Sequence, residues 1–202
     1  MKSFTRSEIY GVGIILLVIA SLTAFNLQVS LRRSRDSQRK ADINAISDAL
    51  GKYQADFGFF PPSTKDGKIL ACKGDNFGNV PDNLTEEEKK AFFFKILKGC
   101  SWGDDALKDV NDEKYEPYLR SIPKDPKFDE GLTYFYISNM NRYQIYAYLE
   151  GGSSEIGYRE GIVKRMLSCG SKICSFGKAY SETPLEKSIE EYENEISEKS
   201  IQ

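Results

Sequence analysis

The chain has 202 residues, a formal net charge of −2 and no histidine. Without histidine it cannot use Ser-His-Asp or Cys-His catalysis or a histidine-ligated metal, and no GxxxxGK(S/T) or GxGxxG phosphate-binding motif is present. We therefore expect no enzymatic activity, no catalytic residue and no cofactor. The small net charge gives no reason to expect nucleic acid as a direct partner.

The N-terminal part of the chain predicts one long helix. Residues 9–29 contain no charged side chain, and this length fits the ~20 residues that a helix needs to cross a bilayer. Further on, apolar side chains recur at the 3, 4, 3, 4 spacing of one helical face: Ile43, Ile46, Leu50, Tyr53 and Phe57. We predict a continuous helix over residues 4–57 that ends near Gly58, because Pro61 and Pro62 cannot continue it.

The first residues follow a recognisable order. A very short basic leader, residues 1–3, stands before Phe4, Thr5 and Glu8, and the apolar segment follows directly. This order resembles the prepilin-like N-terminus of type IV pilins and of the major pseudopilins of type II secretion. The resemblance implies that a prepilin peptidase cleaves between Ser3 and Phe4, that the new amine of Phe4 is methylated, and that Glu8 acts in assembly.

Three later segments extend the resemblance: residues 35–61, 118–126 and 133–150 are similar to pilins and major pseudopilins. The family implies an α+β pilin fold, in which the long N-terminal helix packs against a small antiparallel β-sheet domain. The family usually has Gly at the position of Ser3 and apolar residues at those of Arg6 and Ser7. These differences keep open an uncleaved, single-pass, membrane-anchored binding protein.

Glu8 is also a candidate functional residue on physical grounds. A carboxylate at the edge of an apolar span costs about 3 kcal/mol to place in lipid, so such a group is a candidate for function. The best partner is the positively charged amine of Phe4 on a neighbouring subunit, because low dielectric strengthens an opposite-charge pair. The alternative is that Glu8, Lys2 and Arg6 mark the interfacial end of an ordinary anchor.

The resemblance and the composition together divide the chain into five parts: a leader (1–3), a transmembrane and assembly half of the helix (4–30), an amphipathic half (31–58), a globular domain with an antiparallel sheet (59–180) and an acidic tail (181–202). The tail carries a helix-start signature at Thr183, Pro184 and Glu186, so it is either a docked amphipathic helix or a frayed, solvated segment.

Within the globular domain, Thr85 and Glu88 form a capping box that predicts a helix over residues 86–97. Alternating apolar residues predict an antiparallel hairpin over residues 132–149 that covers the apolar stripe of the long helix. Residues 161–169 are a candidate third strand. Tyr146 and Tyr148 would then lie on the other face, either as ordinary strand residues or as subunit contacts and adhesive surface.

The four cysteines suggest disulfide bonds in an oxidising, extracytoplasmic setting. We favour Cys169 with Cys174 and Cys72 with Cys100, and free buried thiols are the alternative. No CxxC spacing and no histidine support a zinc site, and no DxDxDG spacing supports a calcium site, so we assign no metal.

Two kinds of sequence signal disagree about the side of the membrane on which the globular domain lies. The positive-inside rule sets Lys2 and Arg6 against five basic residues after the span, Arg32, Arg33, Arg35, Arg39 and Lys40, and by itself places the domain inside the cell. The cysteines and the resemblance favour an extracytoplasmic domain on a single-pass protein, which moves to a surface pilus after assembly, and we follow them.

The implied partners are further copies of the chain in a helical homopolymer, prepilin peptidase, a membrane platform with an ATPase-driven machinery, and lipid before assembly. The resulting hypothesis is a structural subunit, a type IV pilin. A pseudopilin of a type II secretion or DNA-uptake machine is the alternative within the same class.

Overall fold

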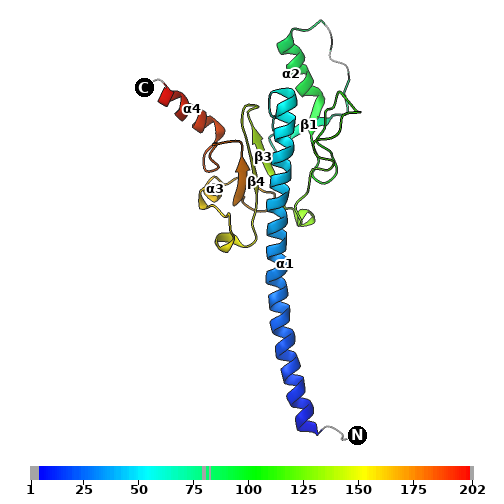
Figure 1. Cartoon of the computed structure of the whole chain (residues 1–202), viewed down its shortest axis with the longest axis vertical. Coiled ribbons are helices and arrows are strands. Elements are labelled where there is room, and N and C mark those ends of the chain that lie inside the picture. Colours follow the sequence, from blue (N-terminus) through cyan, green and yellow to red (C-terminus); the bar gives the residue numbers. More distant parts are fainter. Residues whose placement is uncertain (1–4, 79–80, 82, 201–202) are drawn as a thin grey trace.

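The computed structural model describes residues 5–78, 81 and 83–200, and one long helix dominates it. Helix α1 (Arg6–Phe57) is continuous, and at ~1.5 Å per residue it is roughly 78 Å long. It ends as expected at Gly58, which adopts φ 76° and donates its N–H to the carbonyl of Gln54. Figure 1 shows α1 as a rod whose N-terminal half extends well clear of the other elements.

The two halves of α1 differ in burial. Side chains of the first half face solvent, whereas Ile43, Ile46 and Leu50 in the second half are fully buried. The apolar stripe read from the spacing is therefore the face on which the globular part packs. The long helix and the antiparallel sheets confirm an α+β layout.

The main sheet has three antiparallel strands in the order β3-β4-β5. Strands β3 (Phe135–Ser138) and β4 (Tyr143–Ala147) form the predicted hairpin, with Phe135 opposite Tyr146 and Tyr136 opposite Ile145. The third strand is β5 (Phe176–Ala179), which pairs with β4.

The expected third strand over residues 161–169 is wrong. Its first part forms the short helix α3 (Glu160–Lys164). Beyond α3, Met166 adopts φ 55° and is 69% exposed, so this segment is neither extended nor apolar on one face as a strand would be.

Both faces of this sheet are covered. Tyr136, Tyr143 and Ile145 pack with the apolar stripe of α1 in the larger core. On the opposite face Tyr146 is fully buried with Ile162 and Leu185, and Tyr148 is half-buried beside them. Tyr146 therefore offers no adhesive or subunit-contact surface, because the C-terminal segment covers it.

A second, smaller sheet lies beside the long helix (Figure 1). It pairs β1 (Leu70–Lys73) with β2 (Leu97–Gly99). The capping box predicted at Thr85 and Glu88 starts α2 (Glu86–Ile96), which leads directly into β2. Two short 3₁₀ turns, Phe128–Glu130 and Gly152–Ser154, complete the described elements.

The acidic tail contains helix α4 (Ile189–Ser200). Ser188, rather than Thr183, starts it, because the Ser188 hydroxyl accepts from the Glu191 amide at 3.1 Å and the Glu191 carboxylate accepts from the Ser188 amide at 2.7 Å. The side chain of Asn139 donates to Glu193 at 2.8 Å. The tail is therefore helical and contacts the β3-β4 turn.

Candidate membrane anchor and assembly site

Glu8 occupies the first turn of α1 and completes a capping box. Its Oε2 accepts hydrogen bonds from the backbone N–H of Thr5 at 2.7 Å and from the Thr5 hydroxyl at 2.8 Å. These bonds supply an acceptor for donors that a helix N-terminus leaves unsatisfied. A carboxylate has a second oxygen, so Oε1 keeps the capacity to bind another donor. The expected processing residues, Ser3 and Phe4, lie outside the described residues.

The first half of α1 presents a continuous apolar surface. Large side chains along it are exposed in the monomer, among them Tyr10 at 71%, Leu17 at 69% and Phe25 at 66%. Among the described residues, α1 is the one helix whose length and composition suit a membrane span. Each Å² of apolar surface left in water forfeits about 25 cal/mol, so this half of the helix needs lipid or another helix around it.

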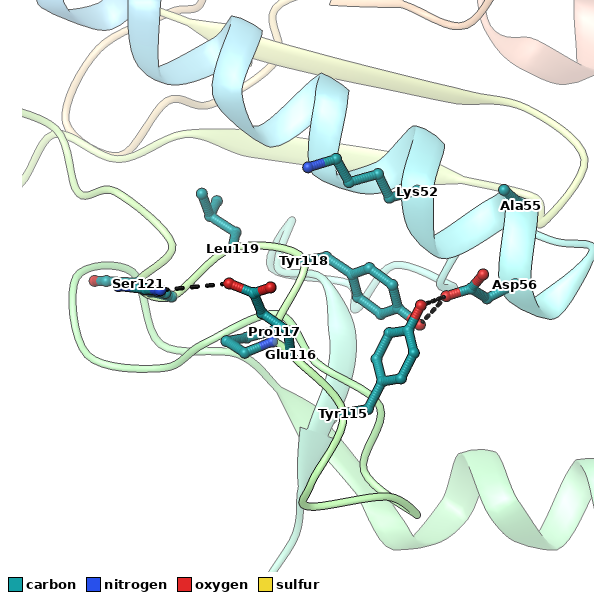
Figure 2. Close-up of a pocket in the computed structure, with 10 residues that line it drawn as sticks. Lys52, Ala55, Asp56, Tyr115, Glu116, Pro117, Tyr118, Leu119 and Ser121 are labelled. Carbon is teal, nitrogen blue, oxygen red and sulfur yellow. Dashed lines mark hydrogen bonds and ion pairs between the residues drawn. The ribbon is translucent and has the colours of Figure 1, made fainter.

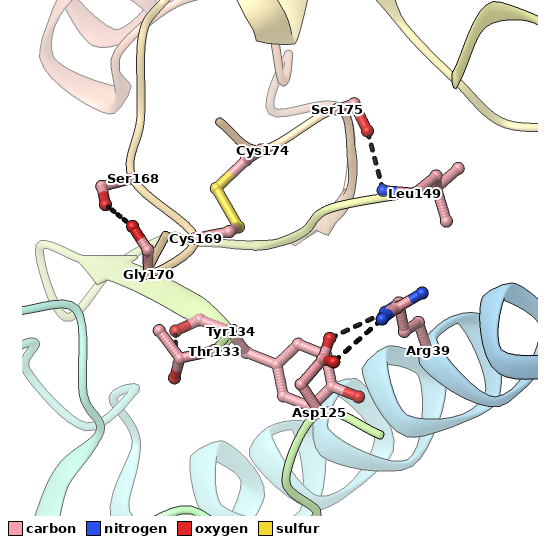
Figure 3. The surroundings of a disulfide bond; sticks show 10 residues. All are labelled: Arg39, Asp125, Thr133, Tyr134, Leu149, Ser168, Cys169, Gly170, Cys174 and Ser175. Atoms are coloured by element: carbon pink, nitrogen blue, oxygen red, sulfur yellow. Dashed lines mark hydrogen bonds and ion pairs between the residues drawn. A yellow bond between two sulfur atoms is a disulfide. The ribbon is translucent and has the colours of Figure 1, made fainter. Parts of the chain in front are cut away.

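A buried ion cluster holds the second half of α1 to the globular part. Arg39 is fully buried, and its Nε and Nη2 donate to the two oxygens of Asp125 at 2.7 and 2.9 Å. Its Nη1 donates to Asp36 and to Glu150, both at 2.8 Å. Arg35 makes a bidentate contact with Glu150, in which both donor–acceptor distances are 2.7 Å. Figure 3 shows Arg39 reaching Asp125 from α1.

The cluster joins three parts of the chain that are remote in sequence. Asp36 also accepts the backbone N–H groups of Glu150 and Gly151, at 2.9 and 2.8 Å, just beyond β4. A buried guanidinium is tolerated when carboxylates satisfy its donors, as they do here. The segment before the first 3₁₀ turn and the chain beyond β4 are thereby fixed to one turn of α1.

Several basic residues after the span form ion pairs within the fold. Arg35, Arg39 and Lys40 all pair with carboxylates of the folded domain, Lys40 with Glu155 at 2.7 Å. Among the ion pairs of the described residues, none involves Arg32 or Arg33. Three of the five basic residues after the span are thus held by carboxylates of the folded domain.

The cluster predicts a loss of stability in acid. Burial alone raises the Glu150 pKa, but hydrogen bonds from Arg35 and Arg39 outweigh it and lower that pKa from 4.5 to about 2. A depressed carboxyl pKa stabilises the fold above the unfolded value, and this stability is lost as pH falls from about 4.5 towards 2. The shift corresponds to at most roughly 3 kcal/mol. Asp42, whose pKa is raised by burial, acts in the opposite direction.

Urea unfolding of the full chain in detergent, compared at neutral and acid pH, measures this effect. Glu150→Gln should be less stable than the native chain at neutral pH, and its stability should fall less steeply below about pH 4.5. Parallel pH profiles for the two proteins would contradict the assignment of the acid sensitivity to Glu150.

Both disulfides join the pairs that the sequence favoured. Cys72 of β1 is bridged to Cys100, the residue after β2, and Cys169 and Cys174 close a tight loop (Figure 3). All four sulfurs are engaged, so the alternative of free thiols is wrong in this structure.

We predict unequal effects of removing the two disulfides. Replacing Cys72 and Cys100 with Ala opens a sequence separation of 28 residues, which on chain entropy costs about 3.5 kcal/mol, whereas the Cys169 and Cys174 pair spans 5 and costs about 2 kcal/mol. Urea midpoints of the two double variants in non-reducing buffer measure the difference. A larger loss for the short loop would show that local packing, rather than loop closure, dominates.

A groove of about 730 Å³ lies beside the C-terminal end of α1 (Figure 2). In it the hydroxyls of Tyr115 and Tyr118 both donate to Asp56 Oδ2, at 2.9 and 2.8 Å, and Arg120 contacts Glu116 at 3.3 Å. Burial, followed by the hydrogen bond to Asp56, raises the Tyr118 pKa and keeps this hydroxyl a donor. These polar groups satisfy one another's hydrogen-bonding capacity. The contacts across the groove therefore hold the loop that carries Tyr115 and Tyr118 against α1.

The described part of the chain holds no cluster of Cys, Asp and Glu side chains arranged to bind a metal ion. Sequence reasoning missed the cluster around Arg39, because its partners lie 86 and 111 residues away. The one local signal was Asp36, one helical turn before Arg39.

No family model matches the chain, and neither the curated proteins nor the solved structures provided a match.

Proposed function

We propose that the chain is a structural subunit, a type IV pilin. It is processed, held in the membrane by the first half of α1 and then polymerised into a helical extracellular pilus. The observation that carries the proposal is the division of one uninterrupted 52-residue helix into an uncovered apolar half and a half that is built into a disulfide-bonded domain.

The physical basis for assembly is the exposed apolar surface. Packing first halves of α1 from several copies would remove side chains such as Leu17 and Phe25 from lipid or water. Glu8 would pair with the methylated amine of Phe4 on a neighbouring copy, and both charges would be neutralised in a low-dielectric surrounding. A prepilin peptidase and an ATPase-driven membrane platform would supply processing and energy.

Two other functions compete. A pseudopilin of a type II secretion or DNA-uptake machine would use the same helix in a short or transient fibre, so its abundance in sheared surface material would be low. An uncleaved, single-pass, membrane-anchored binding protein is favoured by Ser3, Arg6 and Ser7, where the pilin pattern has other residues. It would keep its leader and form no fibres.

The deciding experiment is N-terminal sequencing with intact mass of the protein recovered from the shed cell-surface fraction. The proposal expects a chain that begins at Phe4 and carries one additional methyl group. It also expects a mass increase on reduction that corresponds to the two disulfides. A chain that still begins at Met1 and is found only in membranes would refute the pilin assignment.

A further inference from the structure

A pocket of about 460 Å³ lies where α1 leaves the globular part. The residues that line it change from apolar to charged along the helix. Phe25 and Val29 line the end nearer the apolar half of α1, whereas Arg32, Arg35 and Glu150 line the end nearer the domain. Figure 1 shows that α1 emerges from the base of the globular part and continues towards the N-terminus as a bare helix.

Arg32 differs from the other arginines at this junction. The guanidinium groups of Arg35 and Arg39 are bound by carboxylates, whereas the Nε of Arg32 is buried and has no hydrogen-bond partner within the described residues. An unpaired buried donor costs about 1–3 kcal/mol, so the fold gains if a ligand supplies an acceptor. Arg32 offers a planar fork of donors that matches the oxygens of a phosphate.

Glu150, the acidic group in the pocket, does not repel such an anion strongly. Its two oxygens are both bound by Arg35, and one of them also by Arg39. The cluster of Arg35, Arg39 and Lys127 with Asp36, Asp125 and Glu150 is electrically neutral, so the charge of Arg32 is uncompensated and makes the local charge positive. The pocket therefore combines an apolar end, a cationic end and an unsatisfied donor, and it lies at the end of the candidate membrane span.

We propose that this pocket binds a membrane phospholipid, with the phosphate on Arg32 and the start of an acyl chain against Phe25 and Val29. The order of chemistry along α1, apolar and then cationic, is the order in which a lipid presents acyl chain and phosphate at the bilayer surface. This inference rests on the membrane placement in the proposed function, but it requires neither cleavage nor polymerisation. An anionic lipid such as phosphatidylglycerol suits the positive local charge.

The test is native mass spectrometry of the full chain in detergent micelles titrated with phosphatidylglycerol. Arg32→Gln should weaken lipid binding roughly tenfold or more, the loss expected for one hydrogen bond between charged groups. Arg33→Gln is the matched control, since Arg33 is the adjacent, exposed arginine and should stay within about twofold. Equal binding by the native chain and Arg32→Gln would overturn the proposal.

A second comparison needs no variant. The native chain should bind phosphatidylglycerol in preference to diacylglycerol with the same acyl chains, because the latter lacks the phosphate. Equal binding of the two lipids would overturn the proposal. Displacement of phosphatidylglycerol by millimolar inorganic phosphate would show that the site binds free phosphate, which would overturn the lipid assignment. A chain that keeps Met1 but binds lipid through Arg32 would refute the pilin function and leave the lipid site in place.

Discussion

Glu8→Gln is expected to abolish fibre assembly while the chain still folds and inserts into the membrane. Glutamine is nearly isosteric, and its side-chain oxygen can still accept the Thr5 hydrogen bonds that begin α1. The substitution therefore removes the negative charge and keeps the cap. If Glu8 pairs with the amine of Phe4 on a neighbouring copy, the variant leaves that amine unpaired in an apolar surrounding, at a cost of several kcal/mol per subunit interface.

The measurement is the amount of the chain in a sheared surface fraction relative to membranes, where we expect a decrease of at least about a hundredfold, the factor for ~3 kcal/mol. Glu88→Gln is the matched control, because Glu88 caps α2 by the same contacts from Thr85, both at 2.9 Å. It should leave fibres unchanged. Normal fibres from Glu8→Gln would show that Glu8 serves the helix cap alone.

Local signals explain what the sequence could predict. The continuous helix and its end at Gly58 follow from periodicity and a left-handed glycine, which are properties of neighbouring residues. The β3-β4 hairpin follows from alternation on both sides of a turn. The Cys169 and Cys174 pair is close in sequence, so a tight loop was readily expected.

Two of the errors and omissions arise from distant contacts. Tyr146 was a candidate for an exposed surface because its cover comes from Leu185, which no local pattern connects to β4. Arg39 was counted only as one of five basic residues after the span, and its burial depends on Asp125 and Glu150. The candidate third strand failed for a local reason, because periodicity distinguishes helix from strand poorly in a short apolar run and this one forms α3 instead.

Arg39→Gln is expected to destabilise the domain more than any other charge removal at the junction. The variant leaves Asp36 and Asp125 buried without their guanidinium partner, and breaking a buried pair in this way costs about 3–5 kcal/mol. That is a large share of the ~5–15 kcal/mol by which a domain is stable. Urea unfolding of the full chain in detergent, followed by circular dichroism, measures the loss.

Arg120→Gln provides the control, because Arg120 and its partner Glu116 are 85% and 80% exposed and such a pair contributes about 0–1 kcal/mol. Asp125→Asn keeps an acceptor for the Lys127 amide while removing charge. Combined with Arg39→Gln, it should cost less than the sum of the two single changes, since it removes one of the stranded carboxylates. Additive losses, or equal losses for Arg39→Gln and Arg120→Gln, would contradict a coupled cluster. Coupling would mean that Arg39 and its carboxylates act as one unit that fixes α1 to the domain next to its exposed apolar half.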